Sequence, residues 1–225
     1  MKRIFNHPSD PVSDHVLFID GEAIIIDKPA GLPVTTPRAG GDSLEKMMKS
    51  LAFGFKRPPM IVHRLDQDTS GCLLLARHPK AQKLFNASFE AGTVTKRYMA
   101  ILDGVPAVSE GMIDMALGKV STKEAGWRIV PDPAGKAART HWQVLQTVGA
   151  RTLVEFRPET GRTHQLRVHA ASGIGIPIWG DPVYGRAQGT LLLHATFLSV
   201  PRGDKPPAEA SALLPPSFAA LGFVL

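Results

Sequence analysis

The sequence predicts an α+β fold built around a mixed, mainly antiparallel sheet with flanking helices. Segments typical of strands outnumber helical segments, and the two kinds do not alternate strictly along the chain. The 225 residues include 21 glycines and 19 prolines, which is typical of a loop-rich globular chain. This length suits one domain, which we expect to span residues 1–225 with a core at about 16–200.

A β-hairpin and a short helix are predicted from the first 50 residues. Apolar runs at 16–19 and 23–26 indicate two short strands, joined by a tight turn that Gly21 permits. Asp42 or Ser43 stands before a run compatible with a helix, and one of them is predicted to cap it. Both elements are inferred from local signals alone.

The rest of the chain adds one helix and most of the sheet. The apolar run 72–76 is typical of a buried strand, and Pro79 and Gly92 bracket a helix of about 12 residues. Residues 103–140 carry scattered glycine and proline, and we expect them to be mostly irregular. Further strands are predicted at 95–102, 141–147, 151–157 and 191–199.

The charge distribution permits an anionic partner but does not require one. The chain carries a net charge of +6, and residues 76–170, with 14 basic and 8 acidic side chains, hold the whole excess. Such a concentration suits a phosphate-facing surface, although a solvated basic face without a partner would look the same. The hydrophobic content of 44% excludes a disordered chain.

Cysteine content and hydropathy restrict the compartment. Cys72 is the single cysteine, which excludes an intramolecular disulfide and a cysteine-based zinc site. The first residues lack the apolar core of a signal peptide, and no apolar stretch approaches the roughly 18 residues that a membrane span needs. We therefore expect a cytoplasmic protein without a membrane partner.

The densest polar cluster is the segment His63-Arg-Leu-Asp-Gln-Asp-Thr-Ser-Gly71, between two apolar runs. A turn whose polar side chains form hydrogen bonds with nearby backbone N–H groups would account for this cluster. A metal site on Asp66 and Asp68 is disfavoured, because a spacing of two on an extended segment directs the carboxylates to opposite faces. The two carboxylates would alternatively form the acid/base pair of a glycosidase, or one would be an ionised nucleophile. The residues alone leave these alternatives open.

The same segment resembles the HRLDxxTSG signature of the RluA-type pseudouridine synthases, which convert uridine in structured RNA to pseudouridine. The resemblance spans about residues 16–200 and includes five further segments, of which three agree in the family's order and two, Lys28 to Leu32 and Leu192 to Ala195, also fit. They are Lys28-Pro-Ala-Gly-Leu32, Lys96-Arg97-Tyr98 with Ala100, Gly161 to His169, Gly180 to Gly185, and Leu192 to Ala195. Many members have Val-His where this chain has Val34-Thr35, and we expect this difference to alter a loop on the substrate side. Larger relatives carry an N-terminal S4 RNA-binding domain, which we do not expect here because few residues precede Val16.

The resemblance implies three catalytic residues on the family's catalytic fold with an RNA-binding cleft. Asp66 would be the catalytic aspartate, which either adds to C1′ of the sugar or removes a sugar proton. Tyr98 would stack on the base and serve in deprotonation at C5, and Arg162 would form an ion pair with Asp66. If residues 162–170 are helical, Arg162 shares a face with Gln165 or Leu166 and with His169, and this face would point at the site.

Five further residues are expected to bind the substrate, and no cofactor or metal is expected. Target uridines must leave their stem or loop to enter a pocket, a step that His63 would assist unless it only bonds the backbone. The substrate-binding residues are His63, Arg64, Thr69, Leu166 and His169. Isomerisation needs no redox step and no external group, which is why neither a cofactor nor a metal is implied.

The expected partner is structured RNA, either tRNA or ribosomal RNA or both, and we expect a monomer without an obligate protein partner. Two other functions remain as alternatives. A catalytically inactive RNA-binding or folding module would bind RNA without turnover. A glycoside-bond hydrolase would release free uracil.

Overall fold

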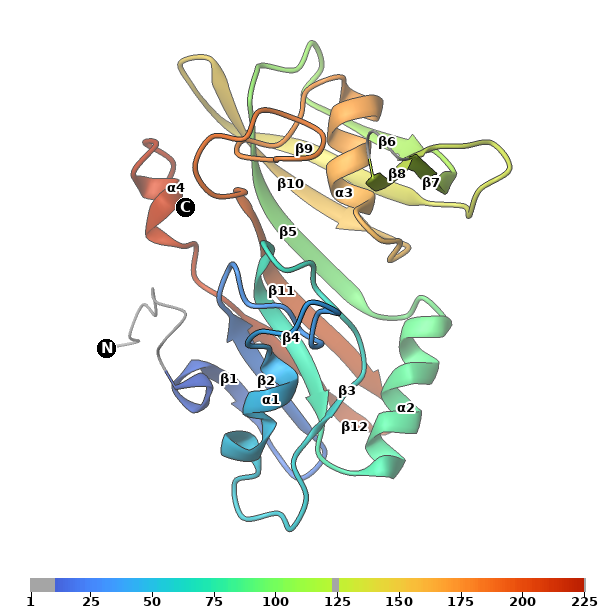
Figure 1. Cartoon of the computed structure of the whole chain (residues 1–225), viewed down its shortest axis with the longest axis vertical. Helices are drawn as coiled ribbons and strands as arrows, with labels where there is room; N and C mark the ends of the chain where they lie inside the picture. The colour runs from blue at the N-terminus through green and yellow to red at the C-terminus, as the bar shows by residue number, and fades with distance from the viewer. Residues whose placement is uncertain (1–10, 123–125, 225) are drawn as a thin grey trace. The chain divides into compact units, whose positions relative to one another are not determined.

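Strand pairing confirms the predicted α+β class with a mixed, mainly antiparallel sheet. The computed structural model describes residues 11–122 and 126–224, which divide into two compact units. Of the described residues, the first unit comprises those up to Lys96 together with His194–Pro215, and the second comprises those from Arg97 to Leu193 and those from Pro216 onward (Figure 1). One catalytic domain that includes both units stays a prediction.

The first unit is built on strands that come from both ends of the chain. In Figure 1 the red strands β11 and β12 lie beside the blue and cyan strands of the N-terminal half. The pairing order is β1 (Val16–Ile19), β2 (Ala23–Lys28), β4 (Ser70–Ala76), β11 (Leu193–Arg202) and β12 (Lys205–Ser211), with β3 (Met60–Ile61) also on β4. All of these pairs are antiparallel except β4 with β11, which is parallel.

Short helical segments and one regular helix accompany these strands. They are a 3-10 turn at Val12–His15, α1 (Leu44–Met47) with a 3-10 turn at Met48–Leu51, and α2 (Pro79–Glu90). The predicted bounds of α2 are confirmed, and its Phe85 is fully buried in the apolar cluster of the first unit. Ser43 occupies the predicted N-cap of α1, but its hydroxyl bonds Thr36 Oγ1 at 2.9 Å and makes no cap bond.

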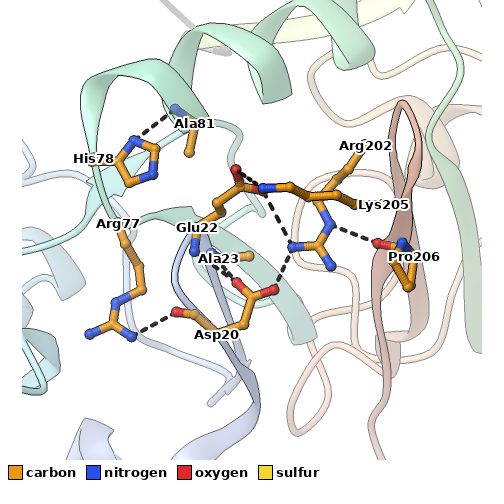
Figure 2. Close-up of polar contacts among 9 residues, drawn as sticks. All are labelled: Asp20, Glu22, Ala23, Arg77, His78, Ala81, Arg202, Lys205 and Pro206. Atoms are coloured by element: carbon orange, nitrogen blue, oxygen red, sulfur yellow. Dashed lines mark hydrogen bonds and ion pairs between the residues drawn. The ribbon is translucent and has the colours of Figure 1, made fainter.

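The turn between β1 and β2 is held by Asp20. One carboxylate oxygen of Asp20 accepts hydrogen bonds from the backbone N–H groups of Glu22 and Ala23, both at 2.8 Å (Figure 2). The other carboxylate oxygen pairs with Arg202 at the end of β11. The predicted hairpin is therefore confirmed. Its turn does not use the conformational freedom of glycine, because Gly21 does not adopt a positive φ; the hydrogen bonds of Asp20 hold it instead.

The second unit contains an antiparallel sheet, a separate hairpin and a short helix. The sheet has the order β5 (Thr95–Leu102), β10 (Arg151–Pro158), β9 (Arg139–Val148) and β6 (Glu110–Asp114). The hairpin pairs β7 (Leu117–Thr122) with β8 (Gly126–Pro131). The helical segments are α3 (Gln165–Val168), which continues as a π-helix at His169–Ile174, and α4 (Pro216–Ala219). None of the helices in the described ranges is long and apolar enough to cross a membrane.

The prediction that residues 103–140 are mostly irregular is wrong, because β6, β7 and β8 lie there. In β6 only Ile113 is buried, and in β8 only Ile129 is buried. A strand with one buried position gives no apolar alternation, so its pattern resembles that of a loop. Strand β6 forms through its pairing with β9, which lies 25 or more residues further along the chain, whereas β7 and β8 pair with each other as a hairpin.

Candidate active site

The polar cluster of the HRLDQDTSG segment forms the turn that enters β4. The backbone N–H of Thr69 donates to the carbonyl of Asp66 at 3.1 Å and closes the turn, and β4 begins at Ser70. The side chain of Asp66 is half-buried, Arg64 is exposed and Thr69 is buried. The structure therefore places Asp66 on a short ordered turn at the start of a buried strand.

A fully buried lysine supports this turn. Lys28, at the end of β2, donates hydrogen bonds from Nζ to the carbonyl oxygens of Pro29 at 2.8 Å, Leu32 at 2.8 Å and Gln67 at 3.0 Å. A protonated lysine has three N–H donors, and all three are used. Because Gln67 follows Asp66 directly, Lys28 links the loop after β2 to the turn that carries the predicted catalytic aspartate.

The loop after β2 contacts the turn at a second point. The backbone N–H of Gly31 donates to the carbonyl of Gln67 at 3.0 Å, and Gly31 has a φ of 84°.

Burial lowers the pKa of Lys28 to about 7, whereas the charges of Asp68 and Asp66 act in the opposite direction. Sequence reasoning did not assign a role to Lys28. The signal that marks it is a lysine at the end of an otherwise largely apolar strand.

His63 is tied to the backbone of β4. Its Nε2 accepts a hydrogen bond from the backbone N–H of Leu74 at 2.9 Å, and its ring stacks on Phe89 with 4.5 Å between centroids. Burial, followed by the charge of Lys96, lowers the pKa of His63 to about 3. The ring is therefore neutral near pH 7 and holds the segment in place. Its contact with a substrate stays a prediction.

The parallel pair of β4 with β11 is joined at the residues that follow the turn. Ser70 Oγ and His194 Nδ1 lie 2.8 Å apart in a buried hydrogen bond. Gly71 has a φ of 105°, and a Cβ there would lie 2.3 Å from the carbonyl oxygen of Ala195. A glycine is thus required where β11 passes, which explains the last residue of the segment.

Tyr98 and Arg162 belong to the second unit. Tyr98 lies in β5 opposite Phe156 of β10, and it packs half-buried against the apolar cluster of this unit. Arg162 is exposed, and its Nε donates to the carbonyl of Ala137 at 3.0 Å. Its backbone N–H donates to Gln165 Oε1 at 2.9 Å. Arg162 is therefore oriented by a loop and by the side chain that begins α3.

The predicted helix over 162–170 starts later than expected. Helix α3 begins at Gln165, because His164 adopts a left-handed conformation with a φ of 52°. Arg162 thus precedes the helix and does not share a helical face with Leu166 and His169, which corrects the sequence prediction.

Leu166 and His169 point into the second unit. Leu166 belongs to its apolar cluster. His169 is fully buried, with Nδ1 2.9 Å from Thr140 Oγ1 and Nε2 3.2 Å from the carbonyl oxygen of Met115. Burial lowers the pKa of His169, while its bond to Met115 acts in the opposite direction. The predicted contacts of Leu166 and His169 with the substrate stay predictions. The burial of both side chains does not support them.

A buried ion pair holds the segment after α3. Arg167 donates from Nε and Nη2 to the two carboxylate oxygens of Asp181, each at 2.8 Å. Asp181 also accepts hydrogen bonds from the backbone N–H groups of Val183 at 2.8 Å and Tyr184 at 3.0 Å. Burial raises the pKa of Asp181, but the hydrogen bonds and charge of Arg167 outweigh it, so the pKa lies below the ordinary 3.8. Sequence reasoning did not assign Arg167 a role.

Replacing Asp181 with asparagine should destabilise the protein by about 3–5 kcal/mol near pH 7, because it leaves Arg167 buried without a countercharge. The pKa of Asp181 is lower in the folded than in the unfolded protein. The stabilisation by the carboxylate is therefore complete above pH 3.8 and is lost as pH falls below it. Urea unfolding of both proteins at a series of pH values measures this, and the two curves should converge only at acid pH.

Asp114→Asn is the matched control. Asp114 pairs with Arg139 at 2.9 Å, and both side chains are about half exposed. Such pairs contribute roughly 0–1 kcal/mol. A loss in Asp114→Asn as large as that in Asp181→Asn would contradict the special role of the buried pair.

The sequence-predicted site residues divide between the two units. The first unit holds His63, Arg64, Asp66 and Thr69, and the second holds Tyr98, Arg162, Leu166 and His169. The ion pair of Asp66 with Arg162 stays a prediction. Within residues 11–122 and 126–224, no group of three or more His, Cys, Asp or Glu side chains is placed to hold a metal ion. A carboxylate on a fixed turn can add to a carbon centre or remove a proton.

Comparisons with known proteins agree on one family. Residues 22–172 match the family described as RNA pseudouridylate synthase. An uncharacterised RNA pseudouridine synthase of Zymomonas mobilis is 57% identical over 94% of this chain and 99% of its own length. Ribosomal large subunit pseudouridine synthase D of the same organism is 38% identical over 81% of this chain, which spans 59% of that relative. A structure of human RNA pseudouridylate synthase domain containing 4 superposes with a TM-score of 0.78 at 26% identity, covering 93% of this chain and 92% of the human chain.

Proposed function

Because the chain belongs to the RNA pseudouridylate synthase family, we propose that it isomerises specific uridines of structured RNA with Asp66 as the catalytic aspartate. The position of Asp66 carries the proposal. Its turn is closed by Thr69 and held from the adjacent loop by Lys28 and Gly31. A catalytic carboxylate needs such a fixed backbone, because small displacements from the reacting atom cost large factors in rate.

The reaction divides into bond cleavage, rotation and rejoining. The N1–C1′ bond of uridine breaks, the uracil turns, and a bond forms between C5 and C1′. The hydrogen on C5 leaves as a proton, and N1 gains one, so that atoms and charge balance. Asp66 would add to C1′ or remove a sugar proton, Tyr98 would stack on the base and assist at C5, and Arg162 would favour the ionised form of Asp66.

The proposed substrate is ribosomal RNA, tRNA or both, and the proposed compartment is the cytoplasm. Relatives named as acting on the large ribosomal subunit favour ribosomal RNA. Side chains of the basic region 76–170 would supply phosphate contacts, which makes binding weaker at higher salt. We propose a monomer without an obligate protein partner.

Release of tritium from RNA labelled at uracil C5 tests this function. The protein is incubated with unmodified, labelled tRNA and, separately, with unmodified, labelled ribosomal RNA, and the tritium in water is counted. We expect release from at least one pool, with pseudouridine in the digested product. Free uracil as the product would instead establish a glycoside-bond hydrolase. Salt-sensitive binding without any release would favour an RNA-binding module.

A further inference from the structure

The β7–β8 hairpin carries an exposed tryptophan at the end of a packed face. Trp127 is 51% exposed, and no other aromatic side chain in the described ranges is as exposed. It lies opposite Ser121, so alternation places it on the same face as Leu117 and Ile129. Leu117 and Ile129 are buried with Val168 in an apolar cluster. The inner part of this face is thus packed, while its outer end presents an indole to solvent.

The indole rests on side chains that are themselves held in place. The ring of Trp127 lies 5.2 Å from that of His164, at an interplanar angle of 34°. His164 Nδ1 is 2.9 Å from Tyr184 Oη, which also accepts the backbone N–H of Ile129 at 3.1 Å. His164 keeps a φ of 52°, which few residues other than glycine adopt and which persists only where surrounding contacts impose it. Trp127 is therefore supported on one side by a rigid arrangement.

A cation lies beside this indole. Lys119 lies on the same face, with Nζ 5.3 Å from the centre of the Trp127 ring, and Arg128 is exposed on the opposite face. Among the described residues of β7 and β8 there is no acidic side chain. A solvent-exposed aromatic face beside a cation is an arrangement with which proteins bind single-stranded nucleic acid.

We propose that Trp127 stacks on an unpaired base of the RNA substrate, with Lys119 contacting an adjacent phosphate. The inference rests on the proposed function and narrows its substrate to RNA that offers a single-stranded base to this hairpin. His164 follows Arg162 by two residues. The stacking platform therefore belongs to the same segment as a predicted catalytic residue, and a bound base there would help to position the RNA. An apolar protein partner fits the site less well, because the exposed indole lies beside the ammonium group of Lys119.

Kinetics of three variants test the proposal with the labelled RNA pools described above. Trp127→Ala should raise the KM for RNA about tenfold or more, the factor expected for one lost stacking contact. The kcat at saturating RNA should change less than about twofold, because stacking outside the reaction centre mainly affects binding. Trp127→Tyr should restore most of the affinity. Trp179→Ala is the control, since Trp179 also lies against a cation, with the Arg151 guanidinium 3.7 Å from its ring centre, but outside the hairpin.

Tryptophan fluorescence gives a second readout that does not depend on turnover. A mixed-sequence single-stranded oligoribonucleotide should quench the emission of the wild type and of Trp179→Ala, and this quenching should be lost in Trp127→Ala. A blunt RNA duplex should quench much less, because its bases are already stacked. Thermal unfolding of each variant shows whether the fold is intact.

The outcomes separate this inference from the proposed function. Tritium release by the wild type with an unchanged KM and unchanged quenching in Trp127→Ala would overturn the stacking role and leave the isomerase function standing. Absence of tritium release and of RNA binding in the wild type would remove the proposed function and the inference together. A self-association that Trp127→Ala abolishes, without an effect on RNA binding, would identify the hairpin as a contact between copies and would also overturn the proposal.

Discussion

Replacing Asp66 with asparagine should slow pseudouridine formation by at least about 10³-fold, the scale of loss when a nucleophile or essential base is removed. The carboxamide has nearly the same shape, but it carries no negative charge and neither attacks C1′ nor accepts a proton. The turn itself uses the Asp66 carbonyl, which accepts from the Thr69 N–H and is unchanged by the substitution. The RNA affinity and the unfolding midpoint should therefore stay near those of the wild type. Single-turnover tritium release measures the loss.

Asp68→Asn is the matched control for this prediction. Asp68 lies on the same turn, and like Asp66 its charge raises the pKa of Lys28. Both variants thus remove one negative charge near the same lysine. We expect Asp68→Asn to retain at least about a tenth of the wild-type rate, since no catalytic step is assigned to it. Equal losses in both variants would show that the charge of the turn matters more than the position of Asp66.

Replacing Lys28 with methionine should cost about 3 kcal/mol or more of the free energy of unfolding. The side chain keeps a similar volume, but the carbonyl oxygens of Pro29, Leu32 and Gln67 lose their donor inside the protein. An unsatisfied buried acceptor costs about 1–3 kcal/mol, and relaxation of the loop recovers part of the sum. Urea unfolding near pH 7 measures the difference.

Lys28→Met should also reduce kcat, because the link between the loop after β2 and Gln67 is lost. Lys46→Met is the control: Lys46 is exposed and donates to one carbonyl, that of Gly41. Its loss should change stability by less than about 1 kcal/mol. A stable and fully active Lys28→Met protein would show that Gly31 and Thr69 alone hold the turn.

Several elements could be predicted because their signals are local. Pro79 and Gly92 mark the two ends of α2, and the structure places its bounds at Pro79–Glu90. The uniformly apolar run that forms β4 likewise identifies a buried strand without knowledge of its partners. Helix and strand propensity, capping and hydrophobic pattern depend on residues within a few positions of one another. Such signals can therefore be read directly from the sequence.

Other elements depend on contacts that the order of residues does not show. Strand β6 is mostly exposed and becomes a strand only through its pairing with β9. The late start of α3 follows from the left-handed His164, whose ring lies against Trp127 and bonds Tyr184. The signals for these features are 20 or more residues away in the chain, and no local pattern reports them.

The sequence by itself determined the family and its likeness to enzymes that isomerise uridine, because the motif at residues 63–71 specifies residue types at fixed spacing. It also determined that Asp66 is the residue on which to test catalysis. The tertiary structure decided which polar residues of the motifs support the fold: Lys28 beside the turn, His169 inside the second unit and Arg167 on Asp181. The physical reason is that a buried polar group must find its partner in the folded protein. That partner is selected by the packing of distant segments and not by neighbours in the chain.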